Sequence, residues 1–210
     1  MTLEREARIN TVLNHRQPDL TILMENVHDP HNISAVMRTC DSIGVQEIYV
    51  LNTQIGLHET FGKKSSSGVA KWLTVHQFQD IKECMTAIKK KYKKVYATHL
   101  GVKSHSLYEL DLTQSVALVF GNEKDGVSDE SLSYCDGNFI IPQVGMVQSL
   151  NISVACAVTL YEAFRQRTAA GLYDGVSRMP VQEHDGLLEH WMQIGSTEWV
   201  RAQELKKYNK

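Results

Sequence analysis

At residues 116–128 the chain reads VALVFGNEKDGVS. A continuous apolar run leads into a glycine-containing loop, which ends at Ser128 just before a segment of helical character. Such a run is typical of a strand buried on both faces of a parallel sheet, because helices cover both sides of that sheet. Ligands of these sheets bind at the carboxyl ends of the strands. The stretch therefore predicts an α/β fold with a ligand site in the loop that follows this strand.

Similar apolar runs alternate with helical patterns along the rest of the chain, at the spacing of βα units. The other predicted strands are Leu20–Val27, Gln46–Leu51, Trp72–His76, Lys94–Thr98 and Asn138–Ile141. Helices are predicted over Asn32–Ile43 and Gln79–Tyr92, from Ser128 onward, and from about Ser149 to Arg167. The predicted fold class is α/β, a parallel sheet with flanking helices. Residues 52–68 show no clear period and are predicted to form a long functional loop.

The pattern outside this sheet predicts two short extensions. A charged segment precedes the break at Pro18, and an apolar helical pattern that contains Trp191 resumes over 187–207. We therefore expect an N-terminal helical extension at 1–17, one α/β domain at 18–170 and a C-terminal helical extension at 171–210.

Composition restricts the function classes further. The chain has 210 residues and a net charge of −2, from 22 Lys and Arg against 24 Asp and Glu. This balance excludes a protein that coats nucleic acid by bulk charge, so any RNA contact must use local patches. No apolar run is long enough to span a bilayer, and the first residues lack a signal-peptide pattern. We therefore expect a cytoplasmic protein with no membrane contact.

The cysteines indicate neither a disulfide framework nor a zinc site. Cys40, Cys84, Cys135 and Cys156 lie far apart, and no C-x-x-C pair is present. Reduced thiols fit this spacing, and no metal is expected.

The loop at 121–128 resembles a phosphate-binding P-loop but lacks its chemistry. A P-loop has Lys directly after its second glycine, where this chain has Val127, and Glu123 and Asp125 would repel phosphate. The G-x-G-x-x-G dinucleotide motif is also absent. An acidic loop suits a neutral or cationic ligand such as S-adenosylmethionine, whose sulfonium and amino groups are positive. Alternatively, the segment is a simple βα turn in which Ser128 caps the next helix.

A second segment, HDPHNISAVMR at 28–38, also follows a predicted strand. On a helix its apolar residues form one stripe and Arg38 points away from it, toward solvent or a ligand. Asn32 is predicted to cap this helix. His28 and His31 are interpreted as loop residues, because Pro30 separates them and no further ligand completes a metal site.

The third segment, IIPQVGMVQSLNISVACA at 140–157, runs from a strand through a loop into an apolar helix of small residues. Such a helix is buried on most sides, with close packing expected at Ser153, Ala155 and Ala157.

Together these segments resemble a known family. In the order N-x5-R, G-x-E-x-x-G-V and I-P-x-x-G-x-V-x-S-L-N-x-S-V-A, the chain is similar to the SpoU-type RNA 2′-O-ribose methyltransferases of the SPOUT class. Its flanks at 16–20, 25–28, 165–167 and 170–174 resemble the tRNA (guanosine-18) branch of that family, called TrmH. The resemblance covers roughly residues 3–174.

The resemblance implies a parallel sheet with a C-terminal trefoil knot, a homodimer, and S-adenosylmethionine bound by three loops inside the knot. It implies cofactor-binding roles for Thr98, Leu100, Gly121, Glu123, Ile141, Met146, Ser149 and Leu150. The catalytic residues it implies are Arg38, Asn32, Glu123, Ser149 and Asn151. The family commonly assigns proton removal to Arg38, at an active site built at the dimer interface. Because an Arg side chain hardly ever deprotonates, we expect Arg38 instead to stabilise the developing oxyanion and to hold an RNA phosphate.

The implied substrate is the ribose 2′-hydroxyl of the D-loop guanosine 18 of tRNA. Basic positions that match the family's RNA contacts are Arg5, Arg8, Arg16, Arg165 and Arg167. The chain departs from its TrmH relatives at Gly175, where they tend to be basic. The lysine run at 89–94 is interpreted as a solvated helix end rather than an RNA patch. Alternatives are the same reaction on ribosomal RNA and a catalytically silent RNA-binding dimer; DNA is not an expected partner.

Overall fold

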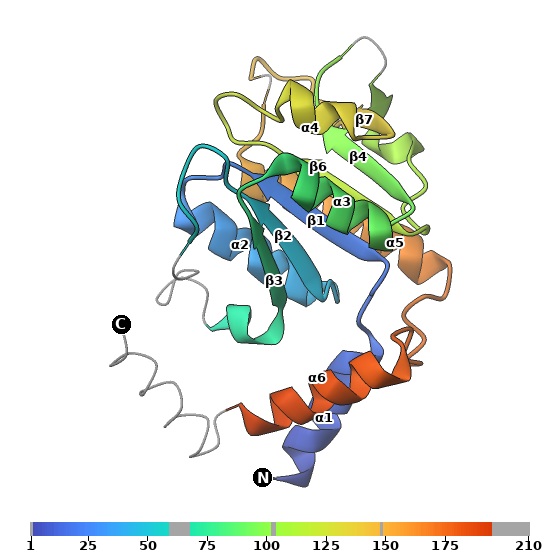
Figure 1. The fold of residues 1–210 in the computed structure, drawn as a ribbon. Coiled ribbons are helices and arrows are strands. Elements are labelled where there is room, and N and C mark those ends of the chain that lie inside the picture. The colour runs from blue at the N-terminus through green and yellow to red at the C-terminus, as the bar shows by residue number, and fades with distance from the viewer. Residues whose placement is uncertain (1, 59–67, 102–103, 148, 195–210) are drawn as a thin grey trace. The chain divides into compact units, whose positions relative to one another are not determined.

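The computed structural model describes residues 2–58, 68–101, 104–147 and 149–194 (Figure 1). Contacts within the chain group it into two units, one of residues 17–173 and one of residues 1–16 and 174–210. The larger unit holds the sheet, and the smaller unit holds the first and last helices.

The larger unit is built on a seven-stranded sheet in the order β3-β2-β1-β6-β4-β7-β5, in which all paired strands are parallel. The strands are Leu20–Glu25 (β1), Glu47–Leu51 (β2), Thr74–Phe78 (β3), Lys94–Thr98 (β4), His105–Ser106 (β5), Val116–Phe120 (β6) and Gly137–Ile140 (β7). The predicted parallel sheet is confirmed. Strand β5 was not predicted, because two residues are too few to show a period.

The strands at the centre of the sheet are buried on both faces. Every residue of β1 and of β6 is buried, as their continuous apolar sequences predict. The register pairs Leu20 with Val116 and Met24 with Phe120, so β1 and β6 end at the same edge of the sheet. The segments that follow them therefore emerge side by side.

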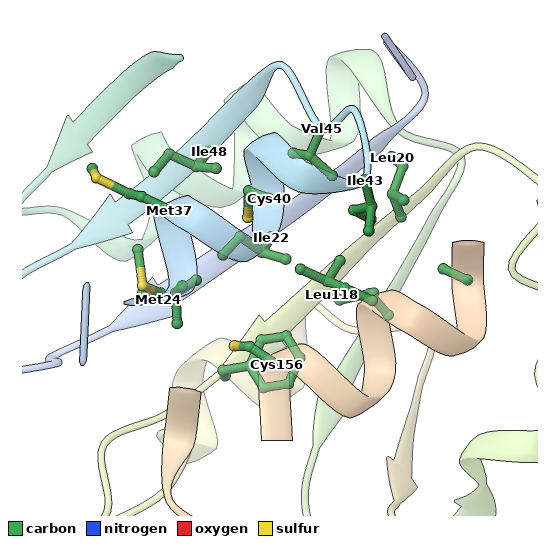
Figure 2. Packing of buried hydrophobic residues seen from close by; sticks show 14 of the residues in the cluster. Leu20, Ile22, Met24, Met37, Cys40, Ile43, Val45, Ile48, Leu118 and Cys156 are labelled. Atoms are coloured by element: carbon green, nitrogen blue, oxygen red, sulfur yellow. The ribbon is translucent and has the colours of Figure 1, made fainter. Parts of the chain in front are cut away.

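Helices cover both faces of the sheet, as Figure 1 shows. The helices of this unit are Pro30–Ser42 (α2), Ile81–Lys91 (α3), Asp129–Ser133 (α4) and Ile152–Ala169 (α5), with short 3-10 turns at Val69–Trp72 (η1) and Leu107–Glu109 (η2). One core lies between the sheet and α2, α5 and η1, and a second lies under α3. Figure 2 shows Met37 and Cys40 of α2 and Cys156 of α5 packed near Ile22, Met24 and Leu118 of the sheet.

The start of α2 corrects two expectations. The cap is Asp29, whose carboxylate accepts a hydrogen bond of 2.8 Å from the His31 N–H, and Asn32 lies inside the helix. His31 is therefore a helix residue rather than a loop residue. The cause is Pro30, which suits the first helical position because its φ is already helical and its missing N–H would find no partner there.

The starts of α4 and α5 agree more closely with the prediction, and so does the described part of the long loop. Ser128 caps α4, as predicted, and Asn151 caps α5 by accepting from the Ser153 N–H at 2.9 Å. The long helix thus begins at Ile152, a few residues after its predicted start. Residues 52–58 form neither helix nor strand, in agreement with the predicted loop, and residues 59–67 lie outside the described residues.

The smaller unit contains the helices Leu3–Asn14 (α1) and Val181–Gln193 (α6), which contact each other. Ile9 and Leu13 of α1 and Trp191 of α6 are buried, and the Arg16 guanidinium lies 5.0 Å from the centre of the Trp191 ring. The predicted C-terminal helix is present but begins before residue 187. Its expected continuation through 195–207 lies outside the described residues.

Candidate active site

A cavity of about 490 Å³ opens at the carboxyl edge of the sheet. It is lined by the segments that follow β4, β6 and β7 and by the first turn of α5. Both its size and its place at the carboxyl ends of parallel strands are typical of sites for small ligands. This cavity is therefore the candidate active site.

The residues predicted to bind a cofactor gather around this cavity. Those that line it are Thr98, Leu100, Gly121, Glu123, Ile141, Ser149 and Leu150. Met146 belongs to the same loop but lies outside the lining, with its side chain 99% exposed. Sequence positions from 98 to 150 are thus brought together by the ends of three strands.

The loop from Gly121 to Ser128 is closed on itself. A Cβ on Gly121 would lie 1.9 Å from the Gly126 carbonyl carbon, so only glycine fits there. The Asn122 side-chain oxygen accepts from the N–H groups of Lys124 at 2.9 Å and Asp125 at 2.7 Å. The Gly126 N–H in turn donates to the Asn122 carbonyl at 3.0 Å. The loop therefore presents a fixed backbone to the cavity.

Three predicted catalytic residues form one hydrogen-bonded chain beside the cavity. The Asn32 amide of α2 donates to Glu123 Oε1 at 2.5 Å and accepts from the Asn151 amide at 3.2 Å. Asn151 Oδ1 also accepts from the Ser153 hydroxyl at 2.6 Å, so Ser153 does more than the close packing expected of it. The chain ties α2, the 121–128 loop and the start of α5 together. It also fixes the orientation of the Asn32 amide, because one end donates and the other accepts.

A second polar cluster supports the loop after β4. The Asn138 amide donates to the His99 carbonyl at 3.2 Å and to Ser104 Oγ at 2.8 Å, and the Ser104 hydroxyl donates to the same carbonyl at 2.8 Å. Neither Asn138 nor Ser104 was predicted as a site residue from the sequence. A polar Asn within a predicted strand was the only available signal, and it did not show that its partner would be the loop after β4.

Arg38 lies on the exposed face of α2, away from the buried residues Ile33, Val36, Met37 and Cys40 of the same helix. The predicted direction of this side chain is confirmed. Among the described residues that line the cavity, Arg38 is not included. Arg38 therefore shares α2 with Asn32 but does not belong to the wall of the cavity in its own subunit.

Arg167 contradicts its predicted role as an RNA contact. The side chain is fully buried, and its guanidinium donates to Asp19 Oδ1 at 2.6 Å and to Gln17 Oε1 at 2.9 Å. It also donates to the carbonyls of Leu112 at 2.9 Å and Gln114 at 2.7 Å. A phosphate cannot reach a guanidinium that is enclosed and bonded in this way.

The other predicted RNA contacts differ in their accessibility. Arg16 is fully buried, with its guanidinium at the Trp191 ring, so the expectation that it binds phosphate is also wrong for this structure. Arg5 is half-buried and donates to the Ile194 carbonyl, whereas Arg8 is exposed. Arg165 is 68% exposed, and both its Nε and Nη2 donate to Glu162, at 2.9 and 2.7 Å.

The lysine run at 89–94 has local partners at the end of α3. Lys91 Nζ donates to Glu47 Oε1 at 2.9 Å, and Lys89 Nζ lies 5.9 Å from the centre of the Tyr134 ring. Lys89, Lys90 and Lys91 occupy the last turn, where the helix dipole favours positive charge.

Within the described residues, no three His, Cys, Asp or Glu side chains gather into a group able to hold a metal ion. The cysteines are free thiols, and burial raises the pKa of Cys84 and of Cys135 to about 12. No described helix is both long and apolar enough to cross a membrane.

Comparison with known proteins extends these observations. Residues 19–161 match the SpoU rRNA methylase family. The chain is 46% identical to the tRNA (guanosine(18)-2′-O)-methyltransferase of Thermus thermophilus, over 91% of this chain and 97% of that protein.

Solved structures give the same result for the fold. The TrmH/SpoU tRNA modifying enzyme of Aquifex aeolicus superposes with a TM-score of 0.82 at 35% identity, covering 90% of this chain and 94% of that one. The SpoU methyltransferase AviRb of Streptomyces viridochromogenes, solved in complex with the cofactor AdoMet, superposes with a TM-score of 0.65 at 26% identity. That match covers 73% of this chain and 60% of the AviRb chain.

Proposed function

The chain belongs to the SpoU rRNA methylase family, and on that basis we propose that it methylates the ribose 2′-hydroxyl of guanosine 18 in the D-loop of tRNA. The observation that carries this proposal is the 46% identity, over 91% of the chain, to a methyltransferase of that nucleotide. The protein is an S-adenosylmethionine-dependent RNA methyltransferase, and tRNA is its substrate.

The cavity fits S-adenosylmethionine. Its volume of about 490 Å³ suits a nucleoside-sized ligand. Gly121 lets the Gly126 backbone close the loop against it, and Glu123 gives the wall a negative charge that matches a cationic ligand. Thr98, Leu100 and Leu150 would hold the ligand from the other loops. When bound, S-adenosylmethionine supplies an electrophilic methyl group.

The chain's own residues would align and activate the ribose hydroxyl. Alignment of the hydroxyl oxygen with the methyl carbon can supply several kcal/mol of the barrier. Arg38 stabilises the oxygen as its proton leaves and holds an adjacent phosphate with its two-pronged guanidinium. Because an Arg side chain hardly ever deprotonates in proteins, that phosphate or a water takes the proton instead. Asn32, fixed by Glu123 and Asn151, orients Arg38 or the ribose.

The proposed working form is a homodimer. Exposed apolar side chains on α5 and on the loop before it would form the interface, and they include Val144, Met146, Val147, Val154 and Tyr161. A second chain packed there would bury surface that is costly to expose and could supply Arg38 to its partner's cavity. This explains why Arg38 is outside the cavity lining of its own chain.

The remaining parts of the proposal follow from this assignment. Residues 18–170 would form the methyltransferase domain, with the predicted knot in its C-terminal part, flanked by the helical extensions at 1–17 and 171–210. Arg8 and Arg165 are the predicted RNA contacts that an RNA phosphate can reach. We place the protein in the cytoplasm, where its substrate is used.

The proposal is tested by locating the methylated nucleotide. The full chain is incubated with S-adenosylmethionine and a tRNA transcript, and primer extension at limiting dNTP is expected to stop at guanosine 18. A transcript with 2′-deoxyguanosine at that position is the matched control and should give no stop.

Two results would contradict the substrate assignment. A stop at another nucleotide, or methyl label found only in ribosomal RNA, would overturn guanosine 18 and leave the methyltransferase activity standing. Binding of cofactor and RNA with no transfer to any RNA would instead indicate a silent RNA-binding dimer.

A further inference from the structure

Glu25 is a buried carboxylate at the end of a central strand. It is the last residue of β1 and is 1% exposed. Both of its oxygens accept from one residue, Ser128, with Oε1 at 2.6 Å from the Ser128 hydroxyl and Oε2 at 3.2 Å from the Ser128 N–H. Among the described residues, no Lys, Arg or His forms an ion pair with Glu25.

A buried carboxylate without an ion pair destabilises the folded protein. Burial of a charge costs several kcal/mol unless hydrogen bonds or an opposite charge compensate for it. No opposite charge compensates for it among the described residues, since none of their ion pairs includes Glu25. The two hydrogen bonds from Ser128 are therefore the interactions that compensate for burial of this carboxylate.

Ser128 is the last residue of the loop that walls the cavity. Its hydroxyl donates to Glu25 and also accepts from the Ser131 N–H at 3.2 Å, so one side chain both ends the loop and caps α4. The other end of the loop is fixed as well, because Phe120 pairs with Met24 in the sheet. Consecutive residues of β1, Met24 and Glu25, thus hold the two ends of the 121–128 loop.

We propose that Glu25 is a positioning residue for S-adenosylmethionine: through Ser128 it fixes the 121–128 loop against β1, and the loop then presents Gly121 and Glu123 to the cofactor. This inference rests on the proposed function. It assigns Glu25 no contact with the ligand, since neither Glu25 nor Ser128 lines the cavity.

The test measures cofactor affinity in the full-length protein by calorimetry. The variants are Glu25→Gln, Ser128→Ala, their combination, and Ser128→Thr, which keeps the hydroxyl. Each ligand is measured separately: S-adenosylmethionine, which carries the sulfonium charge, and S-adenosylhomocysteine, which lacks it. Thr21→Val is the matched control, because Thr21 is a fully buried residue of the same strand whose hydroxyl donates to the Glu47 carbonyl at 2.7 Å, outside the cavity lining.

We expect Glu25→Gln and Ser128→Ala each to raise the Kd of both ligands about tenfold, and the double variant to be no weaker than the weaker single. Ser128→Thr should bind nearly as the wild type does. Thr21→Val should lower the melting temperature and leave both Kd values unchanged. All Kd values are measured well below the melting temperatures of the variants. If Glu25 and Ser128 served only folding, their variants would therefore bind both ligands as Thr21→Val does.

Several outcomes would overturn the inference. Unchanged Kd values in both single variants, or effects that add in the double variant, would show that the two residues do not act through one link. A loss confined to S-adenosylmethionine would show that the charge of Glu25, not the loop position, matters. If Glu25→Gln does not fold, Ser128→Ala and Ser128→Thr decide alone. A wild-type chain that binds neither ligand would instead overturn the proposed function.

Discussion

Arg38 and Arg167 have the same side chain, but Arg38 is exposed and Arg167 is fully buried. This difference determines the function that each can have. Arg38 projects from an exposed helix face, so its guanidinium can meet a substrate. Arg167 is enclosed by Asp19, Gln17 and two backbone carbonyls that no short-range pattern places beside it. Helical periodicity predicts the first environment because it depends on neighbours in one helix. It cannot predict the second, whose partners come from two distant segments.

Replacement of Arg38 by Ala should abolish methyl transfer and leave cofactor affinity nearly intact. The loss of one donor to a developing oxyanion lowers kcat by about 10²–10³-fold or more, while Arg38 lies outside the cavity lining. Arg38→Lys should also be poor, because an ammonium group cannot bind a phosphate in the bidentate way. Single-turnover transfer and calorimetry measure the two effects separately. A fully active Lys variant would contradict this role.

Replacement of Arg167 by Met should destabilise the fold rather than weaken tRNA binding specifically. The change leaves Asp19 and buried carbonyls without their donor, and broken buried pairs cost about 3–5 kcal/mol. Urea unfolding measures the loss of stability. Arg165→Met is the matched control on the same helix, and a much smaller change is expected because Arg165 is mostly exposed. Equal stabilities for the two variants would show that the network around Arg167 contributes little.

At the scale of elements, Glu47 links β2 to β3 and α3. Its carboxylate lies 2.9 Å from Lys91 Nζ and 3.6 Å from His76 Nε2, and its side chain is 14% exposed. Burial raises the pKa of this carboxyl, but its interactions with His76 and Lys91 outweigh burial and lower the pKa from 4.5 to about 2. The link therefore stabilises the fold when Glu47 is ionised.

This link should disappear in acid. Because the folded pKa lies below the unfolded value, its contribution is complete above pH 4.5 and is lost as the pH falls toward 2. After screening by solvent it amounts to on the order of 1 kcal/mol. The stability gap between the wild type and Glu47→Gln in urea unfolding should thus shrink from pH 6 to pH 2.5. Glu83→Gln, in the first turn of α3, is the control, and a gap that stays constant for Glu47→Gln would contradict the assignment.

The elements differ in how well the sequence predicts them. The bounds of β4 and β6 agree with prediction; β6 is a continuous apolar run that ends at a loop signal, and β4 alternates between buried and more exposed residues. The start of α2 differs from prediction, because Pro30 is the first helical residue and Asp29, not Asn32, caps the helix. The strand order and β5 depend on pairing between distant segments, which hydrophobic period does not encode.

The site was predictable only as separate pieces. Glycine and acid residues after β6 indicated a loop for a cationic ligand, and family resemblance selected Asn32, Glu123 and Asn151. Their hydrogen-bonded chain requires α2 and α5 to begin beside one loop, which is a property of the folded sheet. The link between Glu25 and Ser128 gave no sequence signal, because a single Glu at a strand end has no period or motif.

At the scale of the whole molecule, a net charge of −2 means that tRNA affinity must come from a few placed cations. Burial reduces the predicted set, since Arg16 and Arg167 are enclosed. Arg8 is exposed, and Arg165 is exposed but already paired with Glu162, which neutralises part of its charge. Arg5, the third that remains, is half-buried and donates to the Ile194 carbonyl. Arg8 should therefore contribute more than Arg5 or Arg165.

The salt dependence of tRNA binding checks this inequality. Each phosphate contact adds about 0.7–0.9 to the slope of log K against log salt, so Arg8→Ala should flatten the slope by nearly that amount. Arg165→Ala should flatten the slope less, because in the wild type Arg165 is already paired with Glu162 and breaking this pair offsets part of the free energy gained from a phosphate contact.

Lys90→Ala is the control, an exposed lysine at the end of α3 that should leave the slope unchanged. Filter binding at several salt concentrations gives the slopes, and primer extension should still stop at guanosine 18 in every variant, because phosphate contacts position the RNA without selecting the nucleotide. A larger effect from Lys90 than from Arg8 would move the RNA-binding surface to the lysine run and contradict its placement at Arg8 and Arg165.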